Sequence, residues 1–200
     1  MRSNRLQLNT AKTKVLWSTS SRRLHLLPVS PIRVGTDQVM PVSVVRNLGI
    51  YMDADVSMRS HGSKTVAACF AILRQLRSIH RSVPHFVLQS LVSSLILQRL
   101  DYGNATLAGI PSHLTKRMQS VLNSAVRLVF SASRYDRITP LLTQLHSLKV
   151  PERIKFKLAV LVYKCIHQTA PPYLAEELHQ SSADEARQRL RSASTSSLVV

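Results

Sequence analysis

The alternation of hydrophobic and polar residues changes along the chain from an extended to a helical period near His61. Before this point, short apolar runs at residues 14–17, 32–34 and 44–52 are separated by turn residues, and Asn47 and Gly49 break the last run. After it, apolar residues recur at helical spacing. The pattern predicts an α+β chain that is mostly α, with a small β part followed by a helical bundle.

Three of the predicted helices carry a basic stripe beside an apolar one. They begin near His61, after Pro111 and at Pro151. Within each helix the cations are spaced so that they share one face. The residues on these faces are Arg74, Arg77, Arg81, Lys116, Arg127, Arg153, Lys157 and Lys164. We expect one side of each helix to pack and another to attract anions.

The remaining predicted helices are of a different kind. Pro84 opens a helix that is apolar on nearly every side over residues 86–97, which is typical of a central, buried helix. Short helices are expected at residues 138–146 and 173–178, and the polar residues 181–200 are expected to form a disordered tail. The predicted organisation is therefore a β part over residues 1–55, a helical domain over 56–180 and a tail over 181–200.

The charge of the chain points to a polyanionic partner. There are 27 Lys and Arg against 10 Asp and Glu, which gives a formal net charge of +17. From Val56 to Tyr135 there are ten basic residues and a single acid, Asp101. Such a surplus is relieved when phosphates replace their counterions with these cations, so RNA, DNA or an RNA–DNA hybrid is the expected partner. The alternative interpretation, a basic protein that has no polyanionic partner, is not excluded. Any single one of these arginines is explained equally well as a surface residue that increases solubility.

The cysteines, the histidines and the length of the apolar runs indicate the cellular compartment and argue against a metal site or a membrane span. Cys69 and Cys165 are far apart and flanked by apolar residues, as buried thiols in a reducing compartment would be. The eight histidines show no spacing with cysteine that would bind zinc. No signal peptide and no apolar run of membrane-spanning length is present. We expect a soluble intracellular protein, nuclear or cytoplasmic, with no membrane partner and no bound metal or cofactor.

Catalytic groups are sparse. Asp53 and Asp55 form the acidic pair of the first half, and on a strand both would point to one face, where a metal site is conceivable. A pair at a turn or at the start of a helix is the simpler interpretation, because no third carboxylate or Gly-rich phosphate loop accompanies it. The sequence also lacks the motifs of serine and zinc hydrolases.

Residues 6–16 and 47–53, followed by seven later blocks, resemble in this order the reverse transcriptases of non-LTR retrotransposons (LINE type, chicken-repeat and jockey-like). Residues 6–16 resemble the family's L-x-L-N-x-x-K-T block, and residues 47–53 its L-G-V-x-L-D block, the hairpin that grips the primer end. The later blocks resemble the thumb region and are residues 69–77, 99–104, 107–111, 123–129, 138–140, 153–158 and 170–174. Almost the whole chain is covered.

The resemblance implies the end of a palm followed by a thumb, in an RNA-directed DNA polymerase of a mobile element. It implies that Leu48, Gly49 and Ile50 are primer-grip-like. Lys12 matches a lysine that neutralises the departing pyrophosphate, a vestigial role here. The catalytic aspartates and their Mg²⁺ would belong to the parent enzyme, before Met1, so this chain alone is expected not to be an enzyme. The missing palm and fingers would be a partner.

Two other interpretations stay open. The helices can be a protein-interaction module with no nucleic-acid role, in which the apolar residues 86–97 form an interface. An intact small enzyme is the third hypothesis, and primer extension by the purified chain would support it.

Overall fold

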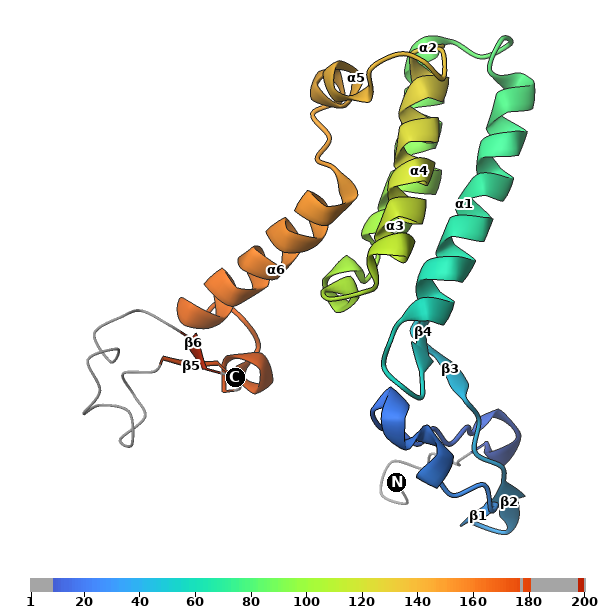
Figure 1. Cartoon of the computed structure of the whole chain (residues 1–200), viewed down its shortest axis with the longest axis vertical. Helices are drawn as coiled ribbons and strands as arrows, with labels where there is room; N and C mark the ends of the chain where they lie inside the picture. Colours follow the sequence, from blue (N-terminus) through green and yellow to red (C-terminus); the bar gives the residue numbers. More distant parts are fainter. Residues whose placement is uncertain (1–8, 177, 181–197, 200) are drawn as a thin grey trace. The chain divides into compact units, whose positions relative to one another are not determined.

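The computed structural model describes residues 9–176, 178–180 and 198–199. The chain divides into two compact units, Met1–Val150 and Pro151–Val200 (Figure 1). The first unit contains η2 (Thr10–Lys12), η3 (Ser21–Leu26), β1 (Ile32–Val34), β2 (Asp37–Val39), β3 (Val44–Asn47), β4 (Ile50–Asp53), α1 (Arg59–Ile79), α2 (His85–Val92), η4 (Ser93–Leu97), α3 (Gln98–Asp101), η5 (Asn104–Leu107), α4 (Ser112–Val129) and α5 (Ile138–Gln144). The second contains α6 (Val150–Ile166), α7 (Pro172–Ala175), β5 (His179–Gln180) and β6 (Leu198–Val199). The expected class, α+β and mostly α, is confirmed.

The core of the first unit lies between α1, α4 and the helical run α2–η4–α3. The apolar stripe predicted for α4 is buried as expected: Leu114, Met118, Val121, Leu122, Ala125 and Val129. On α1, Val66, Cys69 and Leu73 are 3% exposed or less. Burying each such aliphatic side chain contributes about 1.5–3 kcal/mol, so this seam is the main source of the unit's stability.

The run α2–η4–α3 differs from the buried central helix that its composition predicts. Leu88, Val92, Ile96 and Leu100 are buried at four-residue spacing, whereas Phe86 is 72% exposed and Leu95 is 41% exposed. The expectation of burial on nearly every side was wrong, because the run packs against α1 and α4 with one face only. Its middle turn, η4, is a π-helix, an irregularity that often marks a functional position.

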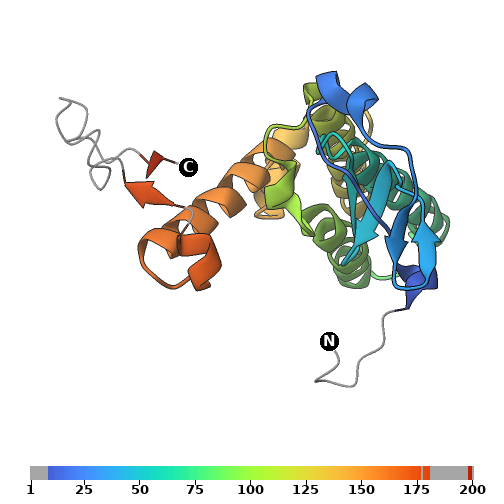
Figure 2. The same ribbon diagram turned by 90° about the horizontal axis from the view of Figure 1, so that it is seen from below.

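Two antiparallel hairpins precede α1 (Figures 1 and 2). Figure 1 shows the second, β3–β4, at the N-terminal end of α1 and the first, β1–β2, farther from it. The second joins β3 and β4 with Asn47 opposite Ile50, so its loop is the two residues Leu48 and Gly49. Both have positive φ, 46° and 87°, as hairpin turns of two residues require. A leucine costs roughly 1–2 kcal/mol in this conformation, which glycine adopts freely. The expected extended segment over residues 14–17 makes only an isolated bridge, from Val15 to Pro41.

The second unit consists mainly of α6. Its buried apolar residues, Ile154 and Cys165, were expected on the inner face, but Leu158, also expected there, is 41% exposed. The division at Val150 falls inside the helical domain predicted over residues 56–180. The predicted disordered tail lies outside the described residues, apart from 198–199. Within the described part of the chain, no helix combines the length and apolarity needed to cross a bilayer.

Candidate nucleic-acid interface

A cleft of about 460 Å³ lies between the β3–β4 hairpin, α1 and the η4–α3 segment. Three cations line it, Arg46 from the hairpin, Lys64 from α1 and Arg99 from α3, together with two tyrosines, Tyr51 and Tyr102. Its lining includes no acidic side chain. We call this the hairpin cleft. Three elements far apart in sequence thus contribute to one positively charged concavity.

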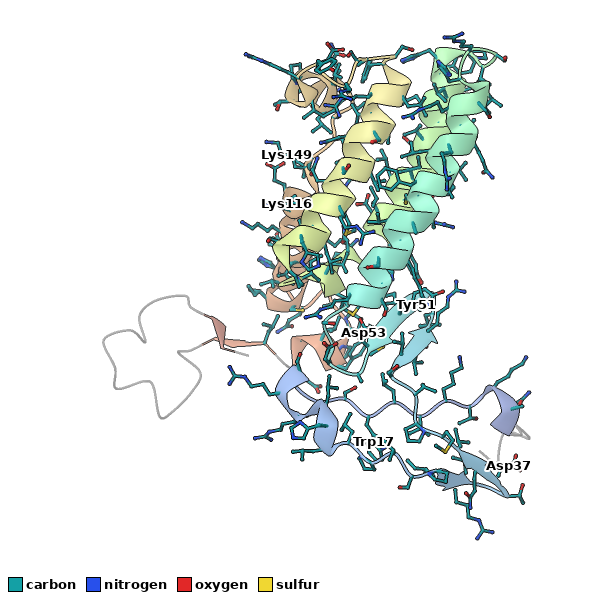
Figure 3. The ribbon with its side chains drawn as sticks, turned by 45° about the vertical axis from the view of Figure 1, so that its right-hand side comes forward. Trp17, Asp37, Tyr51, Asp53, Lys116 and Lys149 are labelled. Carbon is teal, nitrogen blue, oxygen red and sulfur yellow. The ribbon has the colours of Figure 1, made fainter. Side chains whose placement is uncertain are left out.

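Tyr51 organises two of the cations. It lies opposite Arg46 in the register of the hairpin. The Nζ atom of Lys64 is 3.8 Å from the centroid of the Tyr51 ring, and the Cζ atom of Arg46 is 5.5 Å from it. The electron-rich ring face attracts both cations and holds them close despite their mutual repulsion. Figure 3 shows Tyr51 near the N-terminal end of α1.

Tyr102 fixes the tip of the hairpin. Its hydroxyl donates a hydrogen bond to the carbonyl of Leu48. The hairpin and the segment around Tyr102 pack closely at two glycines. A Cβ added at Gly49 would lie 3.2 Å from the Tyr102 ring, and one added at Gly103 would lie 2.6 Å from Cδ1 of Ile50. The blocks at residues 47–53 and 99–104, which resemble separate family motifs, therefore meet in space. Of the three primer-grip-like residues, Gly49 lines the cleft, whereas Leu48 and Ile50 contact Tyr102 and the Gly103 position beside it.

His61 lines the hairpin cleft and is 4% exposed. Burial lowers the pKa of its imidazole, and a hydrogen bond with the Tyr102 backbone acts in the opposite direction. A lowered pKa means that burial favours the neutral ring. Its Nδ1 atom is buried without a hydrogen-bond partner among the described residues. Buried polar atoms of this kind are rare in folded proteins.

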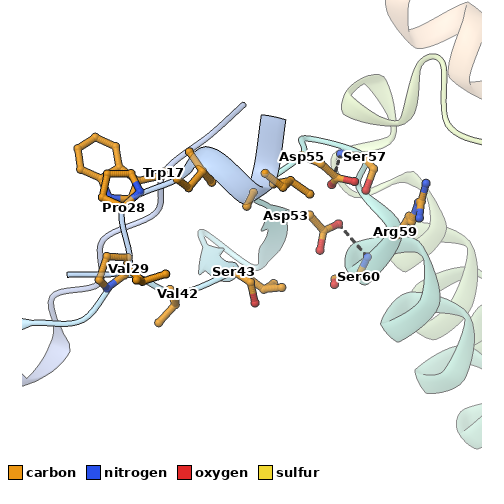
Figure 4. A pocket seen from close by; sticks show the side chains of 15 residues that line it. Trp17, Pro28, Val29, Val42, Ser43, Asp53, Asp55, Ser57, Arg59 and Ser60 are labelled. Atoms are coloured by element: carbon orange, nitrogen blue, oxygen red, sulfur yellow. Dashed lines mark hydrogen bonds between the residues drawn. The ribbon is translucent and has the colours of Figure 1, made fainter. Parts of the chain in front are cut away.

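The two aspartates of the sequence pattern anchor the start of α1 and border a second, apolar cavity of about 580 Å³ (Figure 4). Asp53 accepts a hydrogen bond from the Ser60 amide at 3.0 Å, and Asp55 accepts one from the Ser57 amide at 3.1 Å. Met58, the residue before α1, provides no side-chain cap, so Asp53 supplies one from the end of β4. The interpretation as a pair at the start of a helix is confirmed. Hydrogen bonds from Ser57 are the main cause that lowers the Asp55 pKa.

A third cavity, of about 400 Å³, brings together two of the predicted basic residues, Arg77 of α1 and Arg127 of α4, with His80 and Arg134. Arg127 also holds the loop after α4, because its guanidinium donates to the carbonyls of Ser133 at 3.1 Å and Asp136 at 3.3 Å. We call Arg77, His80, Arg127 and Arg134 the distal cluster. It lies at the C-terminal ends of α1 and α4, away from the hairpin cleft.

The other predicted basic residues line neither basic cavity. Lys12 is exposed on η2, where its amide is bound by Asn9, and Arg74 and Arg81 are exposed in and after the last turns of α1. Lys116 is exposed on α4 (Figure 3). The remaining three lie on α6 of the second unit: Arg153, Lys157 and Lys164.

The sequence pattern missed five residues of the hairpin cleft: Arg46, Tyr51, Lys64, Arg99 and Tyr102. One pair was within reach, because a two-residue turn at Leu48 and Gly49 places Arg46 opposite Tyr51. The others depend on how η4–α3 packs against α1, and local spacing carries no signal for that packing.

Neither a metal-binding group nor a similarity to known proteins is found beside this geometry. Among the described residues, no group of three or more His, Cys, Asp or Glu side chains is placed to hold a metal ion. No protein-family model, no curated protein and no solved structure matches the chain.

Proposed function

We propose that the chain binds nucleic acid at the hairpin cleft, as a catalytically incomplete piece of an RNA-directed DNA polymerase of the non-LTR retrotransposon kind. The observation that carries the proposal is the convergence of Arg46, Lys64 and Arg99 in one cleft beside the Leu48–Gly49 turn, with Arg46 and Lys64 held at the Tyr51 ring. The order of the motif-like blocks along the sequence supports the family, and the meeting of two of them at Tyr102 and Leu48 agrees with it.

The chemistry of the cleft suits a sugar-phosphate backbone. Cations that displace condensed counterions from phosphates give affinity without sequence preference. The Tyr51 and Tyr102 rings supply aromatic surface beside these charges, the combination found in proteins that bind single strands. Leu48 is 83% exposed and has positive φ, so a costly conformation places an apolar side chain in solvent. A strained, exposed leucine at a hairpin tip fits a surface that touches a ligand.

The proposed partners are RNA, DNA or an RNA–DNA hybrid, together with the palm and fingers of the parent enzyme. Mg²⁺ and nucleotide addition belong to that parent in this proposal. The 200-residue sequence contains no adjacent pair of aspartates of the Tyr-x-Asp-Asp kind. Primer extension by the purified chain with Mg²⁺ or Mn²⁺ is expected to give no product. An intracellular site, in the nucleus or the cytoplasm, is proposed with it, since Cys69 and Cys165 are both buried free thiols.

Fluorescence anisotropy with a labelled RNA–DNA hybrid tests the binding site. The double variant Lys64→Gln/Arg99→Gln removes two cations of the cleft and leaves Tyr51 in place. The matched control is Arg22→Gln/Arg33→Gln, which removes the same charge from exposed positions of η3 and β1. Affinity is expected to fall in the cleft variant and to stay near the wild-type value in the control. Equal losses in both would show that net charge alone governs binding, and the proposed site would be abandoned.

A helical protein-interaction module is the second candidate, because large aromatic side chains lie in solvent. Phe86 is 72% exposed on α2, and Phe156 and Tyr163 are 61% and 62% exposed on α6. Light scattering after size exclusion, with and without nucleic acid, separates the two functions. A defined oligomer that nucleic acid leaves unchanged, together with no binding in anisotropy, would favour this candidate.

A further inference from the structure

The distal cluster is a concentrated positive charge. Arg77 and His80 come from the end of α1, and Arg127 and Arg134 from the end of α4 and the loop after it. The hydroxyl-bearing residues Ser124 and Ser131 also line this cavity, which has no acidic lining residue. Guanidinium groups donate hydrogen bonds and carry positive charge, and serine hydroxyls can also donate. Together they suit phosphate oxygens, which accept hydrogen bonds and are negatively charged.

The negative C-terminal ends of the two helices neutralise only part of this positive charge. The C-terminal ends of α1 and α4 each carry about half a negative charge, roughly one in total. Asp136 adds one more, although its carboxylate is engaged by the Ser133 amide at 2.6 Å. Three arginines exceed these two negative charges, and Arg74 and Arg81, exposed nearby on and after α1, enlarge the surplus. The cluster is therefore more positive than the stability of the helix ends requires.

An exposed aromatic ring lies beside the cluster. Tyr135 is 81% exposed, and the Cζ atom of Arg134 is 4.8 Å from its ring centroid. A ring that is largely in solvent contributes little to the core. It has a face on which a nucleic-acid base can stack next to the arginine that would hold the adjoining phosphate.

The exposed side of α1 connects the distal cluster with the hairpin cleft. Lys64 and Arg77 are thirteen residues apart, which is about 20 Å along a helix axis. At 100° per residue, Arg74 falls between them in angle as well as along the axis. No acidic residue occurs anywhere in α1. At 3.4 Å per nucleotide step, 20 Å corresponds to about six steps of a stacked strand.

We propose that the distal cluster is a second phosphate-binding site, occupied by the same nucleic-acid strand that lies in the hairpin cleft about six nucleotides away. The strand crosses α1 past Arg74, and a base stacks on Tyr135. This inference rests on the proposed function and adds to it the path and the minimum length of the ligand. Arg127 acts as a positioning residue, since its guanidinium holds the loop that carries Arg134 and Tyr135.

The salt dependence of binding to a 14-nucleotide oligothymidylate tests the second site. In the variant Arg77→Gln/Arg134→Gln, which leaves Arg127 and its loop contacts intact, the slope of log affinity against log salt is expected to fall by about 1.4, or 0.7 for each lost phosphate contact on a single strand. Arg22→Gln/Arg33→Gln loses the same charge and is expected to keep the wild-type slope. Tyr135→Leu changes no charge, so it should keep the slope while affinity drops about tenfold.

The outcomes separate this inference from the proposed function. If the wild type binds, the cleft variant Lys64→Gln/Arg99→Gln is impaired, and the distal variant behaves like the Arg22/Arg33 control, the second site does not exist. If the wild type fails to bind at low salt, the proposed function fails and the second site with it. A smaller slope in the distal variant, with the affinity loss in Tyr135→Leu, establishes the site.

Discussion

The Tyr102 hydroxyl donates a hydrogen bond to the carbonyl of Leu48, and so joins the end of α3 to the turn of the β3–β4 hairpin. The two residues are 54 positions apart in sequence. The carbonyl belongs to a residue with a costly positive φ, and the donor comes from the lining of the hairpin cleft. One bond therefore couples the shape of the turn to the wall of the proposed binding site.

Replacing Tyr102 with phenylalanine removes this bond and keeps the ring. Because Tyr102 is 53% exposed, water replaces much of the lost interaction, and the free energy of unfolding should fall by about 1 kcal/mol or less. Affinity for nucleic acid should fall more clearly, since the turn is no longer held in place. Urea unfolding and anisotropy measure the two effects. An unchanged affinity would separate the Leu48 turn from the binding site.

Gly103 is expected to tolerate no side chain. It has φ +66°, and an added Cβ would lie 2.6 Å from Cδ1 of Ile50. Gly103→Ala should therefore cost the 1–2 kcal/mol of a left-handed residue plus the cost of moving the hairpin. Gly109→Ala is the matched control, because Gly109 has φ +80° and no atom within 4 Å of an added Cβ.

The excess cost of Gly103→Ala over Gly109→Ala, measured by urea unfolding, reports the contact with Ile50. Adding Ile50→Val to Gly103→Ala removes the clashing Cδ1 atom and should recover part of that excess. Equal losses in the free energy of unfolding for the two alanine variants would show that Ile50 of the hairpin does not pack against Gly103, between α3 and η5.

The pH dependence of stability should contain a contribution from His61. Burial lowers the pKa of its ring from the ordinary value of 6.5. The unfolded chain therefore takes up a proton at a higher pH than the folded chain does. This stability is fully present above pH 6.5 and is lost as the pH falls through 6.5 toward the lowered folded pKa. The free energy of unfolding at pH 7.5 and pH 5 should differ more in the wild type than in His61→Gln. Identical differences in the two proteins would contradict the burial of a neutral His61.

Cys69 should be inert in the folded protein. It is fully buried, and burial raises its pKa to about 11, so roughly one thiol in a thousand is ionised at pH 8. Iodoacetamide at pH 8 is expected to leave Cys69 unmodified in buffer and to modify it in urea, as peptide mapping by mass spectrometry would show. Rapid modification in buffer would mean that the seam between the helices opens readily.

The fold could be predicted from the sequence where local periodicity decides it. The break that Asn47 and Gly49 make in the apolar run over residues 44–52 lies at the turn of the β3–β4 hairpin, and the apolar stripe predicted for α4 is buried. The error at Phe86 and Leu95 has a physical cause: apolar composition was taken as burial on all sides, but this helix has neighbours on one side only.

The site was less predictable than the fold. Helical spacing placed Arg77 and Arg127 correctly on exposed or half-buried faces, but that they share a cavity depends on α1 and α4 running side by side. Lys64, Arg99 and Tyr102 converge because α1 packs against both the hairpin and the η4–α3 segment. Their spacing in sequence, unlike that of the helix stripes, follows no period.

The most direct measurement is ultraviolet cross-linking of an RNA–DNA hybrid to the full chain, followed by mass spectrometry of the cross-linked peptides. Binding at the hairpin cleft predicts cross-links at Tyr51 or Tyr102. Cross-links confined to residues 1–8 and 181–200, where Arg187, Arg189 and Arg191 supply further charge, would contradict it.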